Sequence, residues 1–355
     1  MKPISHKLIS QLPKVELHCH LDGSLRISSI LDIAKKEGIK LPSYNLESLR
    51  PYLKAGKKRG TLEDYIKRFD ITLSVMQSPK SLKRIAYELI EDVAKENVRY
   101  IEVRYSPILH TQRGMTLNTA IESVQKGLKK GEKQYGVKSG IIICGIRHIS
   151  PEKSLILADL AVRYKNKGVV GFDLAGAEEN FPAKEHREAF YLIRNNNINA
   201  TIHAGEAFGP SSIHQAIHQC GANRIGHGTR LKEDKGLMQY VNDHRIALEI
   251  CLTSNWQTKS IRSLKYHPAK LYYEQGIRIT LNTDNRLISG TTLTNEFMLA
   301  HQLFNFTLHD FREITIIAMK SAFIPHQERK KMIKKIAEEF EKKFNLHPEF
   351  INYDK

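Results

Sequence analysis

Residues 14–26, KVELHCHLDGSLR, begin as a strand and end in a turn. Alternating apolar residues predict a strand over Lys14–His20, and Asp22-Gly23 predicts the turn that ends it. Successive side chains of a strand point to opposite faces, so His18 and His20 point the same way, roughly 6–7 Å apart. Two imidazoles paired at a strand end predict half of a metal site.

Short apolar segments rich in β-branched residues recur along the chain and predict seven further strands. With the first, the predicted strands are Lys14–His20, Arg99–Tyr105, Gly140–Arg147, Val169–Leu174, Asn199–Ala204, Arg224–His227, Ile246–Leu252 and Ile277–Thr283. Helical patterns lie between them, at Pro79–Glu96, Leu117–Tyr135, Pro151–Lys165, Lys184–Asn195, Ser211–Cys220 and Lys265–Glu274. This alternation predicts an α/β fold with a parallel sheet covered by helices. Eight units favour a closed (β/α)₈ TIM barrel over an open doubly wound sheet.

Two segments are not part of the strand–helix alternation. A helical insertion is predicted after the first strand, at about residues 46–76, and further helices are predicted after the eighth strand, at the C-terminus. The last of them, Gln327–Phe344, has one apolar face and is interpreted as a packing helix, with a membrane or partner helix as the weaker alternative. No linker rich in Gly, Pro or Ser interrupts the chain, so residues 1–355 are predicted to form a single domain.

Composition predicts an ordinary globular protein that binds neither membrane nor nucleic acid. Of the 355 residues, 41% are hydrophobic and 26% charged, and no segment approaches the ~18 apolar residues of a membrane helix. The first residues lack the pattern of a signal peptide, so we predict a cytoplasmic location. The net charge of +17 is spread over the chain without aromatic-interleaved basic blocks, which is typical of a solvated lysine-rich surface. The four cysteines lack CxxC spacing, which disfavours a cysteine zinc site.

Polar residues gather at the predicted strand ends, where a (β/α)₈ barrel carries its functional residues. The fourth, fifth, sixth and eighth strands end in Asp173-Leu174-Ala175-Gly176, His203-Ala204-Gly205-Glu206, Gly226-His227-Gly228 and Asn282-Thr283-Asp284-Asn285. Each motif alone is weak, because a single interior histidine is more often a satisfied core residue. Their joint occurrence on one rim predicts a functional site.

A metal ion is the simplest explanation of this rim. The predicted ligands are His18, His20, His203 and Asp284. This set leaves a position open for water, as a catalytic metal site requires. Imidazole with carboxylate suits zinc, although iron and other first-row ions remain open.

Other rim residues suit acid–base chemistry. Asp284 could also accept a hydrogen bond from the metal's water, and His227 could orient that water or take its proton. Glu206 could protonate a substrate nitrogen or oxygen, and Gly176 allows close approach to a ligand. Together these residues predict metal-assisted hydrolytic attack on a polarised C=N or C=O bond.

The chain resembles the adenosine deaminase family. The resemblance rests on KVELHCHLDGSLR, EVRYSP (102–107), DLAG (173–176), HAGE (203–206), RIGHGTR (224–230), TSNWQT (253–258) and LNTDN (281–285), in the family's order, from about residue 13 to residue 325. It implies a (β/α)₈ barrel with one Zn²⁺ per chain. The implied reaction converts adenosine, and 2′-deoxyadenosine, to inosine with release of ammonia, in purine salvage.

The resemblance also implies roles for individual residues. The zinc ligands would be His18, His20, His203 and Asp284; the catalytic residues Glu206, His227 and Asp284; the substrate-binding residues His20, Asp22, Gly176 and Asn285. Glu206 would protonate N1 of the purine, and His227 would orient or deprotonate the attacking water. The backbone N–H of Gly176 would reach N3, and Asp22 would meet the ribose hydroxyl.

Two features need separate interpretation. The segment with Leu62, Tyr65, Ile66 and Phe69 resembles the family's apolar gate, or is simply a helix packed on the barrel. Asn285 stands where the family often has a second aspartate. An asparagine amide donates to N7 without prior protonation, so Asn285 is compatible with adenine recognition but leaves the fine substrate preference open.

Three alternatives remain. The first is a deaminase of a related adenine compound, such as adenine, a 5′-modified adenosine or aminodeoxyfutalosine. The second is a catalytically inactive barrel that serves as a binding protein, which the complete residue set disfavours. The third is a two-metal amidohydrolase, which often carries a lysine after the fourth strand, where this chain has DLAG. The expected partners are a small purine nucleoside and water, and the oligomeric state stays open.

Overall fold

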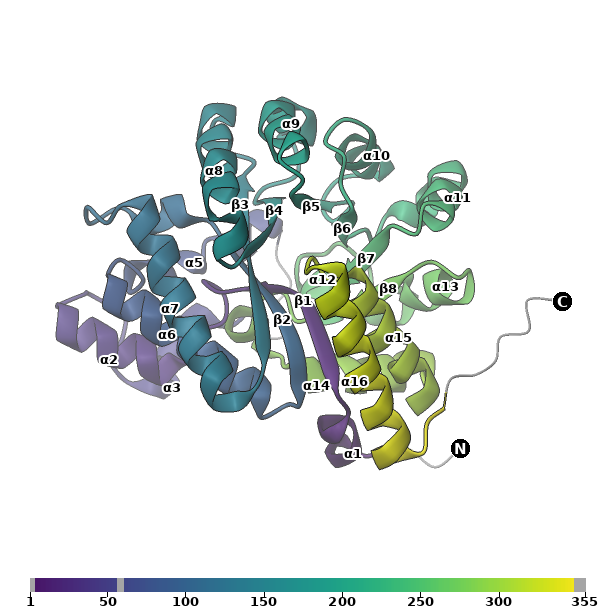
Figure 1. The fold of residues 1–355 in the computed structure, drawn as a ribbon. Coiled ribbons are helices and arrows are strands. Elements are labelled where there is room, and N and C mark those ends of the chain that lie inside the picture. Colours follow the sequence, from purple (N-terminus) through teal and green to yellow (C-terminus); the bar gives the residue numbers. More distant parts are fainter. Residues whose placement is uncertain (1–3, 56–60, 348–355) are drawn as a thin grey trace, which may run out of the picture.

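A computed structural model describes residues 4–55 and 61–347. Eight parallel strands follow one another in chain order, with helices outside them (Figure 1). They are β1 (Lys14–His20), β2 (Val98–Tyr105), β3 (Lys138–Ile146), β4 (Val169–Ala175), β5 (Asn199–Ala204), β6 (Arg224–His227), β7 (Ala247–Ile250) and β8 (Ile279–Leu281). This order confirms the predicted (β/α)₈ barrel.

Helices connect successive strands and bury their apolar faces against the sheet. They are α6 (Pro79–Ala94), α7 (Leu117–Tyr135), α8 (Pro151–Tyr164), α9 (Arg187–Asn195), α10 (Pro210–His218), α11 (Lys235–Asp243) and α13 (Ala269–Glu274). The predicted helix Lys265–Glu274 is wrong in its first turns, because Pro268 has no backbone N–H to donate and disfavours the interior of a helix. A 3₁₀ turn at Leu264–Tyr266 precedes Pro268, and α13 begins after it.

The predicted insertion and the C-terminal helices are present, whereas the helices His6–Gln11, Ile27–Glu37 and Leu252–Gln257 were not predicted. After β1 come α2 (Ile27–Glu37), α3 (Leu46–Leu53), α4 (Leu62–Ile66) and α5 (Phe69–Ser74), and near and beyond the last strands come α12 (Leu252–Gln257), α14 (Leu293–Phe304), α15 (Leu308–Ser321) and α16 (His326–Phe344); α1 (His6–Gln11) precedes β1. Residues 56–60 of the predicted insertion lie outside the described residues. Ile336 and Phe340 of α16 are buried, which confirms it as a packing helix.

The barrel closes between β1 and β8 through a short seam. The backbone N–H of Asp284 donates to the carbonyl of His18 (2.9 Å), and the N–H of His20 donates to the carbonyl of Asp284 (2.7 Å). The N–H of Leu17 donates to Oδ1 of Asn282 (2.8 Å). Three predicted metal-site residues therefore lie at the seam itself.

Within residues 4–55 and 61–347, no helix combines the length and apolar character needed to cross a bilayer. The cytoplasmic location stays a prediction.

Helices α6 and α7 pack closely because glycines of α7 face α6. A Cβ atom at Gly127 would lie 2.3 Å from the carbonyl oxygen of Lys83, and one at Gly131 would lie 2.6 Å from Cβ of Ile90. Both distances are far below van der Waals contact, so only glycine allows this approach.

We expect Gly127→Ala to lower the free energy of unfolding by ~1–3 kcal/mol, because the added methyl group forces the two helices apart. The thermal midpoint should fall accordingly. Gly236→Ala in α11 is the matched control, since its Cβ would meet its nearest neighbour at an ordinary 3.5 Å. Equal midpoints for the two variants would contradict this packing.

Candidate active site

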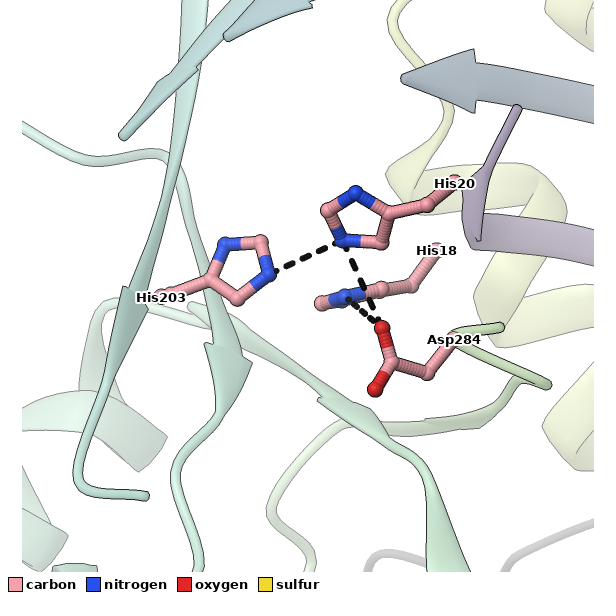
Figure 2. A group of neighbouring side chains, drawn as sticks. All are labelled: His18, His20, His203 and Asp284. Atoms are coloured by element: carbon pink, nitrogen blue, oxygen red, sulfur yellow. Dashed lines mark hydrogen bonds and ion pairs between the residues drawn. The ribbon is translucent and has the colours of Figure 1, made fainter. Parts of the chain in front are cut away.

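The structure brings the four predicted metal ligands together at one end of the barrel. One ligand atom from each of His18, His20, His203 and Asp284 lies within 4.8 Å of all the others. Figure 2 shows the three rings and the carboxylate converging. Nε2 of His18 and Nε2 of His20 each lie 3.4 Å from Oδ1 of Asp284. Nε2 of His18 is buried and makes no hydrogen bond to the described residues, so the cluster fits a cation.

Local backbone geometry turns the ligands inward. Alternation along β1 places His18 and His20 on one face. Asp284 has φ +60°, a left-handed conformation that is costly for a non-glycine residue and is often found at functional sites. The same turn ends β8 earlier than predicted, at Leu281 instead of Thr283. Ser254 donates to Oδ2 of Asp284 (2.5 Å), which leaves Oδ1 facing the histidines.

Two buried carboxylates hold the backs of the histidine rings. Glu249 lies 2.9 Å from Nδ1 of His18, and Asp173 lies 3.0 Å from Nδ1 of His203. The guanidinium of Arg104 bridges both carboxylates, at 2.9 Å from Asp173 and 2.8 Å from Glu249. Each carboxylate accepts the Nδ1–H, which directs the other ring nitrogen toward the metal position.

These carboxylates are ionised. Burial by itself would raise the pKa of Asp173, but His203 and Arg104 hold that pKa well below its usual value. Burial likewise opposes ionisation of Glu249, but Arg104 and Arg224 bring its pKa well below the usual range. Nε of Arg224 donates to Glu249 (2.6 Å) from the other side. The interior of the barrel therefore holds a network of paired charges.

No role was predicted from the sequence for Arg104, Arg224 or Glu249. All three are buried charged residues within short strands of mostly apolar neighbours. A charge at an interior position of a barrel strand was the available signal, since such a residue needs a partner.

Glu206 follows β5 and faces the cavity. Its Oε1 accepts from the Thr258 hydroxyl (2.9 Å), and its Oε2 lies 3.5 Å from Nε2 of His227. His227 has φ +64° and is buried. Burial, and then the charge of His18, hold the pKa of His227 well below its usual value, so the ring is neutral.

The loop that carries Glu206 is fixed by Glu178, which the sequence analysis did not single out. The Glu178 carboxylate accepts four backbone N–H groups, those of Gly205 (2.7 Å), Glu206 (2.9 Å), Ala207 (2.6 Å) and Phe208 (3.1 Å). Four charge-assisted hydrogen bonds to one loop restrict its conformation strongly. The sequence signal was an acid two residues beyond the DLAG turn.

A cavity of about 300 Å³ opens beside the cluster of His18, His20, His203 and Asp284. Its lining includes every predicted catalytic or substrate-binding residue, namely His20, Asp22, Gly176, Glu206, His227, Asp284 and Asn285. Gly176 has φ +96°, and a Cβ there would lie 2.9 Å from Nδ1 of His148. Burial raises the pKa of Asp22 to about 7.

The predicted gate segment also lines this cavity. Leu62, Tyr65, Ile66 and Phe69 all contribute to its wall, which agrees with the gate interpretation. Tyr65 also donates to or accepts from the hydroxyl of Ser289 (2.6 Å). The segment thus packs on the barrel and borders the cavity at once.

Comparison with known proteins agrees with this geometry. The family model described as adenosine deaminase matches residues 13–339. The chain belongs to the adenosine deaminase family. It is 40% identical to the adenosine deaminase of Clostridium perfringens, over 90% of this chain and 97% of that protein. It is 41% identical to the adenosine deaminase of Mycobacterium avium, over 94% and 96%. A probable adenosine deaminase of Dictyostelium discoideum is 39% identical over 91% of this chain, which spans only 42% of that longer protein.

Solved structures of other proteins share the fold of this chain. Arabidopsis ADAL in complex with IMP has a TM-score of 0.83 and 27% identity, over 93% of this chain and 97% of that one. An amidohydrolase from Burkholderia ambifaria with bound zinc has a TM-score of 0.86 and 21% identity, over 95% and 92%. The resemblance inferred from the motifs is confirmed, and the chain belongs to a family of hydrolases that act on C–N bonds.

We expect Asp173→Asn to lower zinc affinity by about 10–100-fold, because the amide cannot stabilise Nδ1–H of His203 as the carboxylate does. Competition against a chromophoric chelator measures the change. Asp159→Asn in α8 is the matched control, since Asp159 pairs with Arg163 at the surface. Unchanged zinc affinity in Asp173→Asn would show that Asp173 does not support the ligand.

Proposed function

We propose that this protein converts adenosine and 2′-deoxyadenosine to inosine-type products and ammonia by hydrolysis, with one zinc ion per chain. The observation that carries the proposal is the position of the four-residue cluster at the base of a cavity whose wall holds Glu206. Membership of the adenosine deaminase family supports the same reaction. The family assignment makes purine salvage the natural setting.

His18, His20, His203 and Asp284 would hold the zinc ion. When bound, zinc lowers the pKa of a water molecule from about 15.7 to about 7 and so supplies a nucleophile at neutral pH. The buried, hydrogen-bonded second layer of Asp173 and Glu249 keeps the rings in place for this purpose.

The chain's own residues would bind and activate the purine. Glu206 would protonate N1 from Oε2, since Oε1 is held by the Thr258 hydroxyl. This proton makes C6 more electrophilic. The backbone N–H of Gly176 would donate to N3, and Asp22 would hold a ribose hydroxyl.

Asn285 would donate its amide to N7. Its Oδ1 is buried and makes no hydrogen bond to the described residues. A Cβ at Gly23 would lie 1.8 Å from that oxygen, so the glycine of the opening motif makes room for the Asn285 side chain. This close approach explains the Asp22-Gly23 turn after β1.

The cavity suits an uncharged nucleoside better than a nucleotide. Among the described residues that line it there is no lysine or arginine, while Asp22 and Asp70 both contribute carboxylates. Arabidopsis ADAL, by contrast, binds the nucleotide IMP. A 5′-phosphate in this cavity would lose hydration without gaining a cationic partner among the lining residues that the structure describes.

Replacement of Glu206 by glutamine tests the proposed acid. We expect kcat for adenosine to fall by about 10²–10⁴-fold, because the amide cannot transfer a proton to N1. Zinc content, measured by elemental analysis, should stay unchanged. If Glu206→Gln kept the wild-type kcat, Glu206 would not be the group that protonates N1.

No lysine or arginine is found among the described residues that line the cavity, so we expect the protein to discriminate between adenosine and AMP. We expect kcat/KM for AMP to be lower by at least on the order of a hundredfold, since an unpaired buried phosphate costs several kcal/mol. The loss of absorbance on conversion of adenine to hypoxanthine measures both rates. Equal values would contradict the nucleoside assignment, and no turnover of either compound would contradict the proposed function.

A further inference from the structure

Behind His227 lies a chain of hydrogen bonds that ends at a backbone N–H. Nδ1 of His227 lies 2.9 Å from Nδ2 of Asn255, in α12. Oδ1 of Asn255 lies 3.1 Å from Nε2 of His267. Nδ1 of His267 accepts from the backbone N–H of Ala269 (3.0 Å) at the start of α13. All three side chains are buried, so water does not compete for these contacts.

The backbone N–H of Ala269 fixes the direction of every hydrogen bond in this series. The N–H of Ala269 can only donate, so Nδ1 of His267 must carry a lone pair. Burial lowers the pKa of His267 to about 3, so its single ring proton is on Nε2 and is donated to Oδ1 of Asn255. The amide of Asn255 must therefore present its NH₂ group to His227.

The consequence for His227 follows from the same rule. Because the Asn255 amide donates, Nδ1 of His227 carries a lone pair, so the one proton of the ring is on Nε2. Nε2 is the atom that lies beside Glu206, at 3.5 Å from Oε2, and His227 lines the cavity. The opposite tautomer would set two N–H groups against each other at 2.9 Å in a buried site.

We propose that Asn255 and His267 are positioning residues that fix His227 as a hydrogen-bond donor toward the cavity. His227 then orients the nucleophile through Nε2–H and does not take its proton, which would pass to the carboxylate of Asp284. The orienting role of His227 rests on the proposed function, whereas the tautomer of His227 follows from the hydrogen bonds alone. It decides between the two roles, orienting or deprotonating, that the sequence left open.

Asn255→Asp reverses the direction of the hydrogen bond to His227 with almost no change in side-chain shape. A carboxylate accepts from His267 and also from Nδ1–H of His227, so the proton of the neutral His227 ring moves from Nε2 to Nδ1. We expect kcat for adenosine to fall at least tenfold, with KM and zinc content changed less than threefold. Retained or increased kcat would overturn the proposal, because a lone pair on Nε2 is what a general base needs.

Asn118→Asp is the matched control. Asn118 is exposed in α7 and accepts from Arg163 through Oδ1, which an aspartate can also do. Its kcat, KM and zinc content should equal those of the wild type. A fall in both variants would point to a general effect of added negative charge and would overturn the specific role of Asn255.

Nuclear magnetic resonance reads the tautomer without turnover. In zinc-loaded wild-type protein labelled with ¹⁵N-histidine, we expect the ring protons of His227 and His267 on Nε2, with unprotonated Nδ1. Comparison with His227→Asn and His267→Asn assigns the signals. A proton on Nδ1 of wild-type His227 would overturn the proposal even if Asn255→Asp failed to fold. Absence of adenosine turnover with the expected tautomers would instead refute only the proposed function.

Discussion

The guanidinium of Arg104, buried inside the barrel, joins the two carboxylates that contact His18 and His203. Asp173 and Glu249 must each balance the cost of burial, and both find Arg104 between them. Removal of one member would leave a buried charge without its partner. The same buried pairs therefore set the interior charges together with the orientations of the His18 and His203 rings.

Other buried polar groups hold Glu206 and His227 in a similar way. Glu178 fixes the backbone of the loop that carries Glu206, and Asn255 fixes the ring of His227 from behind. In both cases a side chain outside the cavity determines which atom faces it. The first-layer residues can then adopt backbone conformations with positive φ, such as those of His227 and Asp284, because the surroundings hold them.

The sequence predicted the barrel and the ligand set because both depend on local pattern. The bounds of β1, β5 and β6 match, and the motifs at the strand ends converge as a barrel requires. β7 was predicted as Ile246–Leu252 and observed as Ala247–Ile250, because Leu252 already begins α12. Hydrophobic pattern alone does not reveal where a strand turns away to present polar groups.

The supporting residues were not predictable in the same way. Arg104 of β2 pairs with Glu249 of β7, and Asn255 of α12 contacts His267, which lies outside that helix. Their roles depend on contacts between distant parts of the chain, which no short motif encodes. The predicted single domain and the individual catalytic roles stay predictions.

The seam between β1 and β8 has a consequence for how the site comes into being. The chain through β7 already contains His18, His20 and His203, but it lacks both the strand that closes the sheet and the fourth residue of the cluster. Asp284 arrives with the strand that shuts the cylinder, and its backbone pairs with both neighbours of Cys19. A cation bound by the four residues would link β1 and β5 to the turn after β8, so its binding would stabilise the closed barrel.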